Sequence, residues 1–386
     1  MSPPMTEQTP ASRLQGLQSM LRTDPRNPVL RQQCTELALS SRDYDGLIVT
    51  ADIVLAAQPT DAAAQFDRAT GLIGKREYRQ ALEILHALRP LQPETYGIDF
   101  NIGLCHYCLN EYEAALPHLR ECFSKGLRDA GLLRLLVSTY HHLGMVDEAA
   151  QVCIDNPDPA ATDAALAGAY ALLFLDADDA ARASRYAEIA LRLNPKSIDG
   201  RVVQGTLLAA RLRTEQAKSM LESVVAEAPQ TARAWVGLGS LAMLAQDLAS
   251  ARSLFTRGVE LMPRHVGSWH ALGWTQLMQN DLPAAQATFE HALELDRNFA
   301  ETHGALAAIA ATKGERESAE RLIEVALRLD PDCLSAKFAQ SVLARRAGDV
   351  AQAQSIIETT AAAFGAQQTS ALGQSLGNLL RKTKRN

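Results

Sequence analysis

The stretch ARAWVGLGSLAMLAQDLASARSLFTRGVELMPR (residues 232–264) contains two helical patterns joined by a polar turn at Gln246 and Asp247. The stretch that follows, residues 266–298, repeats its landmarks. Equivalent places are held by Trp235 and Trp269, Leu238 and Leu272, Gly239 and Gly273, Ala251 and Ala285, and Phe255 and Phe289. Self-similarity at a period of about 34 residues is typical of stacked arrays of helix–turn–helix units.

The spacing Trp-x-x-Leu-Gly, followed by alanine, phenylalanine and a closing proline, resembles the tetratricopeptide repeat. Gly239 and Ala251 leave room for neighbouring helices, and Phe255 fills the space between repeats. Pro263 ends the second helix because proline cannot continue the hydrogen-bond ladder. The resemblance implies an all-α, right-handed solenoid whose first helices line a concave groove.

The pattern extends along nearly the whole chain when its register is carried forward and back by whole periods without insertion. Ten repeats start at residues 28, 62, 96, 130, 164, 198, 232, 266, 300 and 334 and cover 28–367. The small position of the second helix is alanine in nine of the ten, which chance composition would not produce. We expect a capping helix at 11–27, and a second capping helix with a basic tail at 368–386, because an array leaves an apolar face at each end. Residues 1–10 are expected to be disordered.

The fourth repeat departs from the pattern in its second helix. Pro157 stands where the other repeats are still helical. Proline removes a backbone donor and disfavours helical geometry at the preceding residue, so this helix should end about one turn early. Two outcomes are open: a bend in the array at 155–160, or a shortened helix for which its neighbours compensate.

Composition and charge argue against several classes of function. A net charge of −6 provides no basic face for a nucleic acid. The N-terminus lacks the apolar core of a signal peptide, and no stretch approaches the roughly 18–20 apolar residues that span a bilayer. We therefore expect a cytoplasmic protein without direct membrane insertion. Its six cysteines do not form a disulfide scaffold in 386 residues and are expected to be free thiols.

No catalytic constellation is evident, because the chain has no phosphate-binding loop, no G-x-S-x-G elbow and no H-E-x-x-H motif. Cys105 and Cys108 share a helix face, and His142 occupies the repeat position of Cys108 one repeat later, so these three are weak candidates for a zinc site. Buried thiols are the preferred interpretation. We expect no enzyme activity, no cofactor and no metal.

The groove implied by the resemblance has two parts. Repeats two to four present polar residues with interleaved aromatics: Phe66, Asp67, Phe100, Asn101, Tyr107, Arg134, His141 and His142. Repeats five to eight present largely apolar residues: Leu172, Val236, Met243, His270, Trp274, Leu277 and Met278. Large exposed apolar patches usually mark interaction sites, so we expect the apolar part to provide affinity for a partner and the polar part to orient it. The alternative is that superhelical curvature closes the groove and the apolar side chains pack on one another.

These observations favour a non-catalytic scaffold or adaptor that binds a protein or peptide segment in its concave groove. The lysine and asparagine residues of the chaperone-binding carboxylate clamp are absent at the corresponding positions. Three alternatives stay open: an accessory subunit of a bacterial envelope, pilus or secretion assembly; an array that self-associates into a homo-oligomer; and a metal- or redox-responsive protein.

Overall fold

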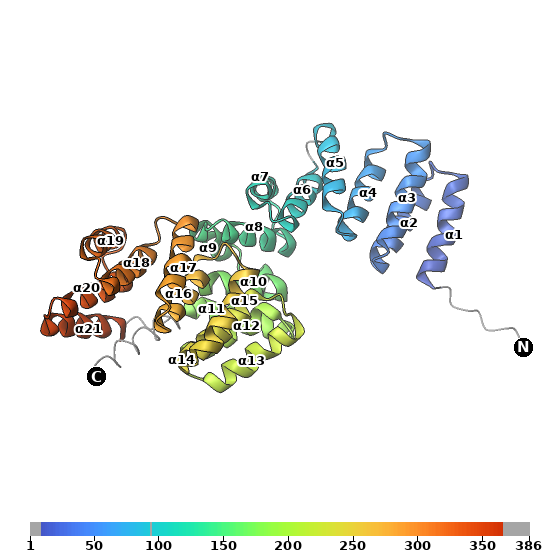
Figure 1. Ribbon diagram of the computed structural model, residues 1–386. Coiled ribbons are helices and arrows are strands. Elements are labelled where there is room, and N and C mark those ends of the chain that lie inside the picture. The colour runs from blue at the N-terminus through green and yellow to red at the C-terminus, as the bar shows by residue number, and fades with distance from the viewer. Residues whose placement is uncertain (1–8, 93–94, 366–386) are drawn as a thin grey trace, which may run out of the picture. The chain divides into compact units, whose positions relative to one another are not determined.

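The computed structural model describes residues 9–92 and 95–365 (Figure 1). These residues form 21 α-helices and two short 3₁₀ helices, and they contain no β-strand, so the predicted all-α class is confirmed. The chain forms two compact units, residues 1–173 (unit 1) and 174–386 (unit 2). The predicted C-terminal capping helix and basic tail at 368–386 lie outside the described residues, as does the expected disorder of residues 1–8.

Ten helical hairpins follow the single helix α1 (Pro10–Thr23) in the described chain. Their first helices are α2 (Pro28–Ser41), α4 (Ala62–Gly74), α6 (Tyr96–Cys108), α8 (Ala130–His142), α10 (Ala164–Asp176), α12 (Ile198–Ala210), α14 (Ala232–Leu244), α16 (Val266–Met278), α18 (Ala300–Lys313) and α20 (Leu334–Arg346). Their second helices are α3 (Tyr44–Ala57), α5 (Tyr78–Leu88), α7 (Tyr112–Ser124), α9 (Val146–Asp155), α11 (Ala180–Leu193), α13 (Thr214–Glu227), α15 (Leu248–Leu261), α17 (Leu282–Leu295), α19 (Arg316–Leu329) and α21 (Val350–Gly365). The first helices begin at the ten residues where the sequence register places the repeat starts.

One backbone conformation recurs in the turn of every hairpin. A residue with φ between 56° and 87° follows each first helix, once in every repeat: Arg42, Arg76, Asn110, Gly144, Asp178, Leu212, Gln246, Asn280, Gly314 and Gly348. This left-handed residue turns the next amide back toward the helix, as where Asp247 N donates to Ala242 O at 2.9 Å. The turn therefore satisfies carbonyl groups that the end of the first helix leaves without partners.

Short polar side chains begin many of the helices. Asp61 accepts a hydrogen bond from Ala64 N at the start of α4, and Asp129 accepts from Gly131 N at the start of α8. Asp247 does the same for Ser250 N at the start of α15. Such caps satisfy amides that have no partner within the first turn of a helix, so the sequence marks these starts locally.

The small positions of the repeat account for the close packing within each hairpin. The second-helix alanines are fully buried or nearly so, as at Ala251 and Ala285. A methyl group placed on Gly239 would lie 2.8 Å from Phe255 Cδ1, and one placed on Gly273 would lie 2.7 Å from the ring of Phe289. Each glycine is therefore required because an aromatic ring from the second helix of the same hairpin packs directly on its backbone.

The fourth hairpin is shorter than the others, as the sequence predicts. Its second helix, α9, ends at Asp155 after 10 residues, and a 3₁₀ helix at Pro159–Ala161 follows. The Tyr170 hydroxyl donates to Asn156 O at 3.1 Å and ties the end of α9 to the next first helix. A neighbouring residue thus compensates for part of the lost turn, whereas a change of direction at 155–160 stays a prediction.

Candidate partner-binding surface

In unit 1 the first helices α4, α6 and α8 contact one another in succession. We call their shared side, which carries the predicted aromatic residues, the first-helix face of unit 1. Phe66 and Phe100 occupy the same repeat position on α4 and α6 and are half-buried. A methyl group on Gly97 would lie 3.5 Å from Phe66, and one on Gly131 would lie 3.8 Å from Phe100. Each ring therefore lies beside a glycine at the start of the next first helix, and part of its surface reaches solvent.

An aromatic cluster lies where α6, α7 and α8 meet. The rings of Tyr112 and His142 stack, with centroids 4.2 Å apart and planes 7° apart. Tyr107 meets Tyr112 edge-on at 5.5 Å, and its ring lies 6.0 Å from that of His142. The sequence predicts Tyr107 and His142 as surface residues but not Tyr112, because Tyr112 begins a second helix and falls outside the first-helix positions.

The polar residues predicted for this face differ in what they already bind. Asp67 accepts from Arg31 at 3.1 Å and from Thr35 at 3.2 Å. Burial raises the pKa of Asp67, and the Arg31 guanidinium partly offsets that effect. Asp67 is thus largely occupied within the array. The other predicted polar residues are half-buried Asn101, Arg134 and His141.

In unit 2 the structure places the centre of the predicted apolar surface in the core. Met243 and Trp274 are each 2% exposed and His270 is 3% exposed. The Trp274 ring meets that of Phe338 at 5.6 Å and that of Phe289 at 6.1 Å. The expectation of an open surface is therefore wrong for these three residues, and the alternative of self-packing holds there.

The remaining apolar residues of the prediction surround that core or lie apart from it. Val236, Leu277 and Met278 are half-buried and pack against the cluster that contains Trp274. Leu172 is half-buried on α10 in unit 1. None of these four offers a fully exposed side chain.

Contacts between first helices two repeats apart explain why the predicted apolar surface of unit 2 is closed to solvent. Phe338 lies on α20 and its partner Trp274 on α16. At the same interval of two repeats, Arg233 on α14 forms two hydrogen bonds of 2.7 and 2.6 Å with Asp176 at the end of α10. Such bonds form only when alternate first helices approach closely, so curvature brings side chains into contact across the face.

Closure in unit 2 leaves polar atoms without partners. His270 Nε2 and Trp274 Nε1 are buried and have no hydrogen-bond partner in the described part of the chain. Burial lowers the pKa of His270, because the charged imidazolium would lose its hydration. His270 is therefore a neutral core residue and not a surface ligand.

The cysteine and histidine residues considered for zinc do not come together as a metal site. Cys105 is buried and Cys108 is exposed, while His142 stacks on Tyr112. Burial raises the pKa of Cys105 to about 12, which keeps its thiol protonated. Within residues 9–92 and 95–365, no group of three or more His, Cys, Asp or Glu side chains is placed to hold a metal ion.

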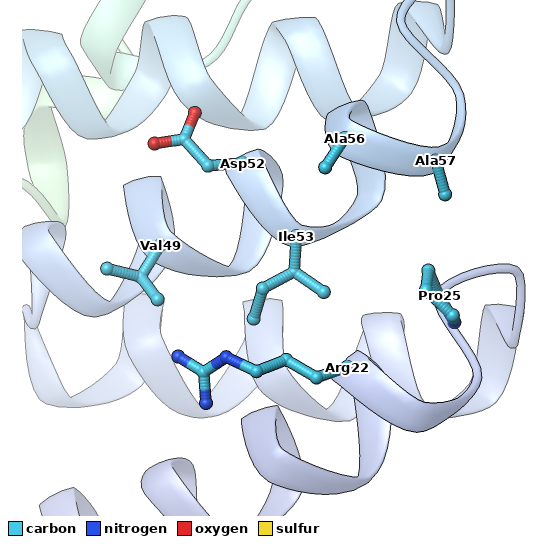
Figure 2. Close-up of a pocket in the computed structure, with 7 residues that line it drawn as sticks. All are labelled: Arg22, Pro25, Val49, Asp52, Ile53, Ala56 and Ala57. Carbon is cyan, nitrogen blue, oxygen red and sulfur yellow. The ribbon is translucent and has the colours of Figure 1, made fainter.

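A shallow depression of about 530 Å³ lies between α1 and α3 (Figure 2). Its lining residues are Arg22, Pro25, Val49, Asp52, Ile53, Ala56 and Ala57, none of which belongs to a first helix. Asp52 is already paired with Arg68 at 2.9 Å. The depression thus has aliphatic walls and one guanidinium, that of Arg22, and it offers no convergent set of polar groups.

Comparisons with known proteins agree with this fold. Tetratricopeptide repeat family models match residues 66–122 and 230–298. The crystal structure of the hetero-tetramer Cut9–Hcn1 of the APC/C is similar at a TM-score of 0.50 and 14% identity, over 96% of this chain and 88% of that one. No curated protein sequence matches the chain.

Two further solved structures are similar at lower scores. A tetratricopeptide repeat protein from Parabacteroides merdae has a TM-score of 0.46 and 17% identity, over 69% of this chain and 98% of its own. Yeast Tom70 has a TM-score of 0.38 and 14% identity, over 97% of this chain and 93% of its own.

The helices, their turns and the matching family models define an all-α solenoid of helix–turn–helix repeats. The chain contains tetratricopeptide repeats, which the family models match over residues 66–122 and 230–298. Among its described residues, no helix is both long and apolar enough to cross a membrane.

Proposed function

We propose that this protein is a non-catalytic scaffold that binds an extended or helical segment of a partner protein on the first-helix face of unit 1. Tetratricopeptide repeat arrays commonly serve as protein-interaction scaffolds. The observation that supports this site is the contrast between the two units. Phe66, Phe100 and Tyr107 keep part of their surface in solvent, whereas Met243, His270 and Trp274 in unit 2 are buried.

The chemistry of this face suits a protein segment. Aromatic rings provide a large contact area at a small cost in side-chain entropy, and they dominate the affinity of many interfaces. Phe66 and Phe100 recur at the same position of consecutive repeats, so they present apolar contacts at a regular interval. Asn101 and Arg134 add hydrogen-bond donors on the same set of helices, which would orient the bound backbone.

The test is affinity capture with three forms of the full chain: wild type, Phe100→Ser, and Leu91→Ser as the matched control. Leu91 is 73% exposed and lies outside the first-helix face, so its change removes a similar apolar surface elsewhere. A partner of this face should be retained by wild type and by Leu91→Ser and lost with Phe100→Ser. Equal retention by all three forms would refute the proposed site.

The same preparations address the alternatives. Sedimentation of wild type at several concentrations detects self-association, because the measured mass would then rise with concentration. A homo-oligomer that Phe100→Ser dissociates would make a second copy of the chain the partner. Capture of envelope, pilus or secretion proteins that depends on Phe100 would favour the accessory-subunit alternative.

A further inference from the structure

Three histidines meet within unit 1 at the seam between the second and third repeats. His86 lies on α5, His106 on α6 and His118 on α7. The ring centroid of His86 lies 6.0 Å from that of His106 and 6.3 Å from that of His118. The rings of His106 and His118 are also 6.3 Å apart. The three imidazoles thus form a nearly equilateral triangle shared by three helices.

Two of the three histidines have a carboxylate partner. His106 Nδ1 lies 2.7 Å from Glu111 at the start of α7, and His118 Nδ1 lies 2.8 Å from Asp99 on α6. Each carboxylate also accepts from an arginine. Arg79 lies 2.9 Å from Glu111, and Arg89 lies 2.7 Å from Asp99.

His86 differs from the other two. Among the described residues no carboxylate lies within hydrogen-bond distance of it, and the charged groups that act on it are His106, His118 and Arg89, all positive when protonated. Partial desolvation and then these positive neighbours lower the pKa of His86, but its side chain is exposed, so solvent screens part of this effect. The folded chain therefore binds fewer protons at His86 than the unfolded chain does. Its contribution to stability is present above the ordinary histidine pKa of about 6.5 and is lost as the pH falls from there through the lowered value.

We propose that His86, His106 and His118 form an acid-sensitive latch, in which protonation of all three rings pushes α5 away from α6 and α7. Mild acid would then loosen the seam between the second and third repeats before it affects the rest of the array. The charges that oppose this effect are those of Asp99 and Glu111, which are already shared with Arg89 and Arg79 and so only partly neutralise the added protons.

The seam also carries the apolar contacts between these repeats. Leu85 and Leu88 of α5 belong to one buried cluster with Ile98 and Ile102 of α6. Movement of α5 would open that cluster and change the spacing between Phe66 and Phe100. Partner binding at the first-helix face would then weaken in acid, a consequence that rests on the proposed function.

The test is amide hydrogen exchange of the full chain at about pH 7 and at about pH 5.5, with the rates corrected for intrinsic exchange. It compares wild type with His86→Gln and His291→Gln. His291 on α17 in unit 2 is half-buried, meets Trp269 edge-on at 4.5 Å and lies 3.5 Å from Glu294, and it serves as a control histidine outside the cluster. In wild type, protection of α5 and α6 should fall more than that of α14 and α15. Because His86 is exposed and solvent screens its charge, the loss of protection should be less than the roughly tenfold per pKa unit that a fully buried histidine would give.

His86→Gln should remove most of this difference and His291→Gln none of it. A titration of the histidine side chains of wild type by NMR provides a measurement that needs no variant, and there the midpoint of His86 should lie below the ordinary histidine pKa of about 6.5. The latch is refuted by an equal loss of protection in wild type and His86→Gln, or by a His86 midpoint at or above about 6.5. Neither measurement requires a partner, so failure here is distinct from failure of the proposed binding face.

Discussion

Replacement of Trp274 by alanine tests whether this residue belongs to the core, as the structure shows, or to a binding surface, as the sequence predicts. A buried tryptophan side chain removes about 200 Å² from water, which corresponds to about 5 kcal/mol at 25 cal/mol per Å². The unpaired indole N–H offsets about 1–3 kcal/mol of this gain. We therefore expect Trp274→Ala to lower the free energy of unfolding of unit 2 by about 3 kcal/mol, in line with the usual cost of such core truncations.

Two companion variants make this expectation specific. Trp274→Phe keeps most of the ring and deletes the unpaired N–H, so it should cost less than about 1 kcal/mol. Trp235 is half-buried and donates to Pro229 O at 2.8 Å, so Trp235→Ala should cost less than Trp274→Ala. Urea denaturation followed by circular dichroism measures the stability, and hydrogen exchange in α16 and α18 locates the loss. The burial argument fails if Trp274→Ala is no less stable than Trp235→Ala.

Three further predictions concern particular contacts. Gly239→Ala should destabilise the array by roughly 1–3 kcal/mol, because the new methyl group would lie 2.8 Å from Phe255. Gly16→Ala on α1 should instead stabilise it by about 1 kcal/mol, because no atom lies within 4 Å of the added methyl group. Thermal melting compares the two variants. Gly144→Ala should cost about 1 kcal/mol, again by thermal melting, through its φ of 73° alone, since no atom lies within 4 Å of the added methyl group. The lowered pKa of His270 contributes stability that is present above about pH 6.5 and is lost as the pH falls. The free energy of unfolding of His270→Phe, measured by urea denaturation, should therefore depend less on pH than that of wild type. An unchanged pH dependence would contradict a buried neutral imidazole.

Much of the architecture follows from short-range sequence. Small residues recur in most repeats at the positions of Gly239 and Ala251, and they place each hairpin because a small residue is needed wherever two helices approach closely. Pro157 predicts the early end of α9 for an equally local reason, the loss of a backbone donor. The left-handed turn residue is less visible. Only three of its ten occurrences are glycine, and Leu212 gives no local sign of a positive φ.

The candidate surfaces depend on contacts between residues that are distant in the sequence. The repeat register assigns Trp274 to the first-helix side of its repeat, but Phe338, two repeats later, covers its ring. The histidine cluster has a similar origin, since His86, His106 and His118 occupy three different positions of the repeat and no periodic pattern connects them.

The sequence by itself thus determined the repeat, the helix starts and the residues that pack within each hairpin, because these depend on neighbours within about one period. Only the tertiary structure decided which first-helix residues stay accessible. The physical reason is that curvature is the sum of small rotations between successive repeats, and a small difference per repeat is enough to bring alternate first helices together. In unit 2 these rotations bring Arg233 within hydrogen-bond distance of Asp176 and leave Trp274 buried. In unit 1 they leave Phe66 and Phe100 partly exposed.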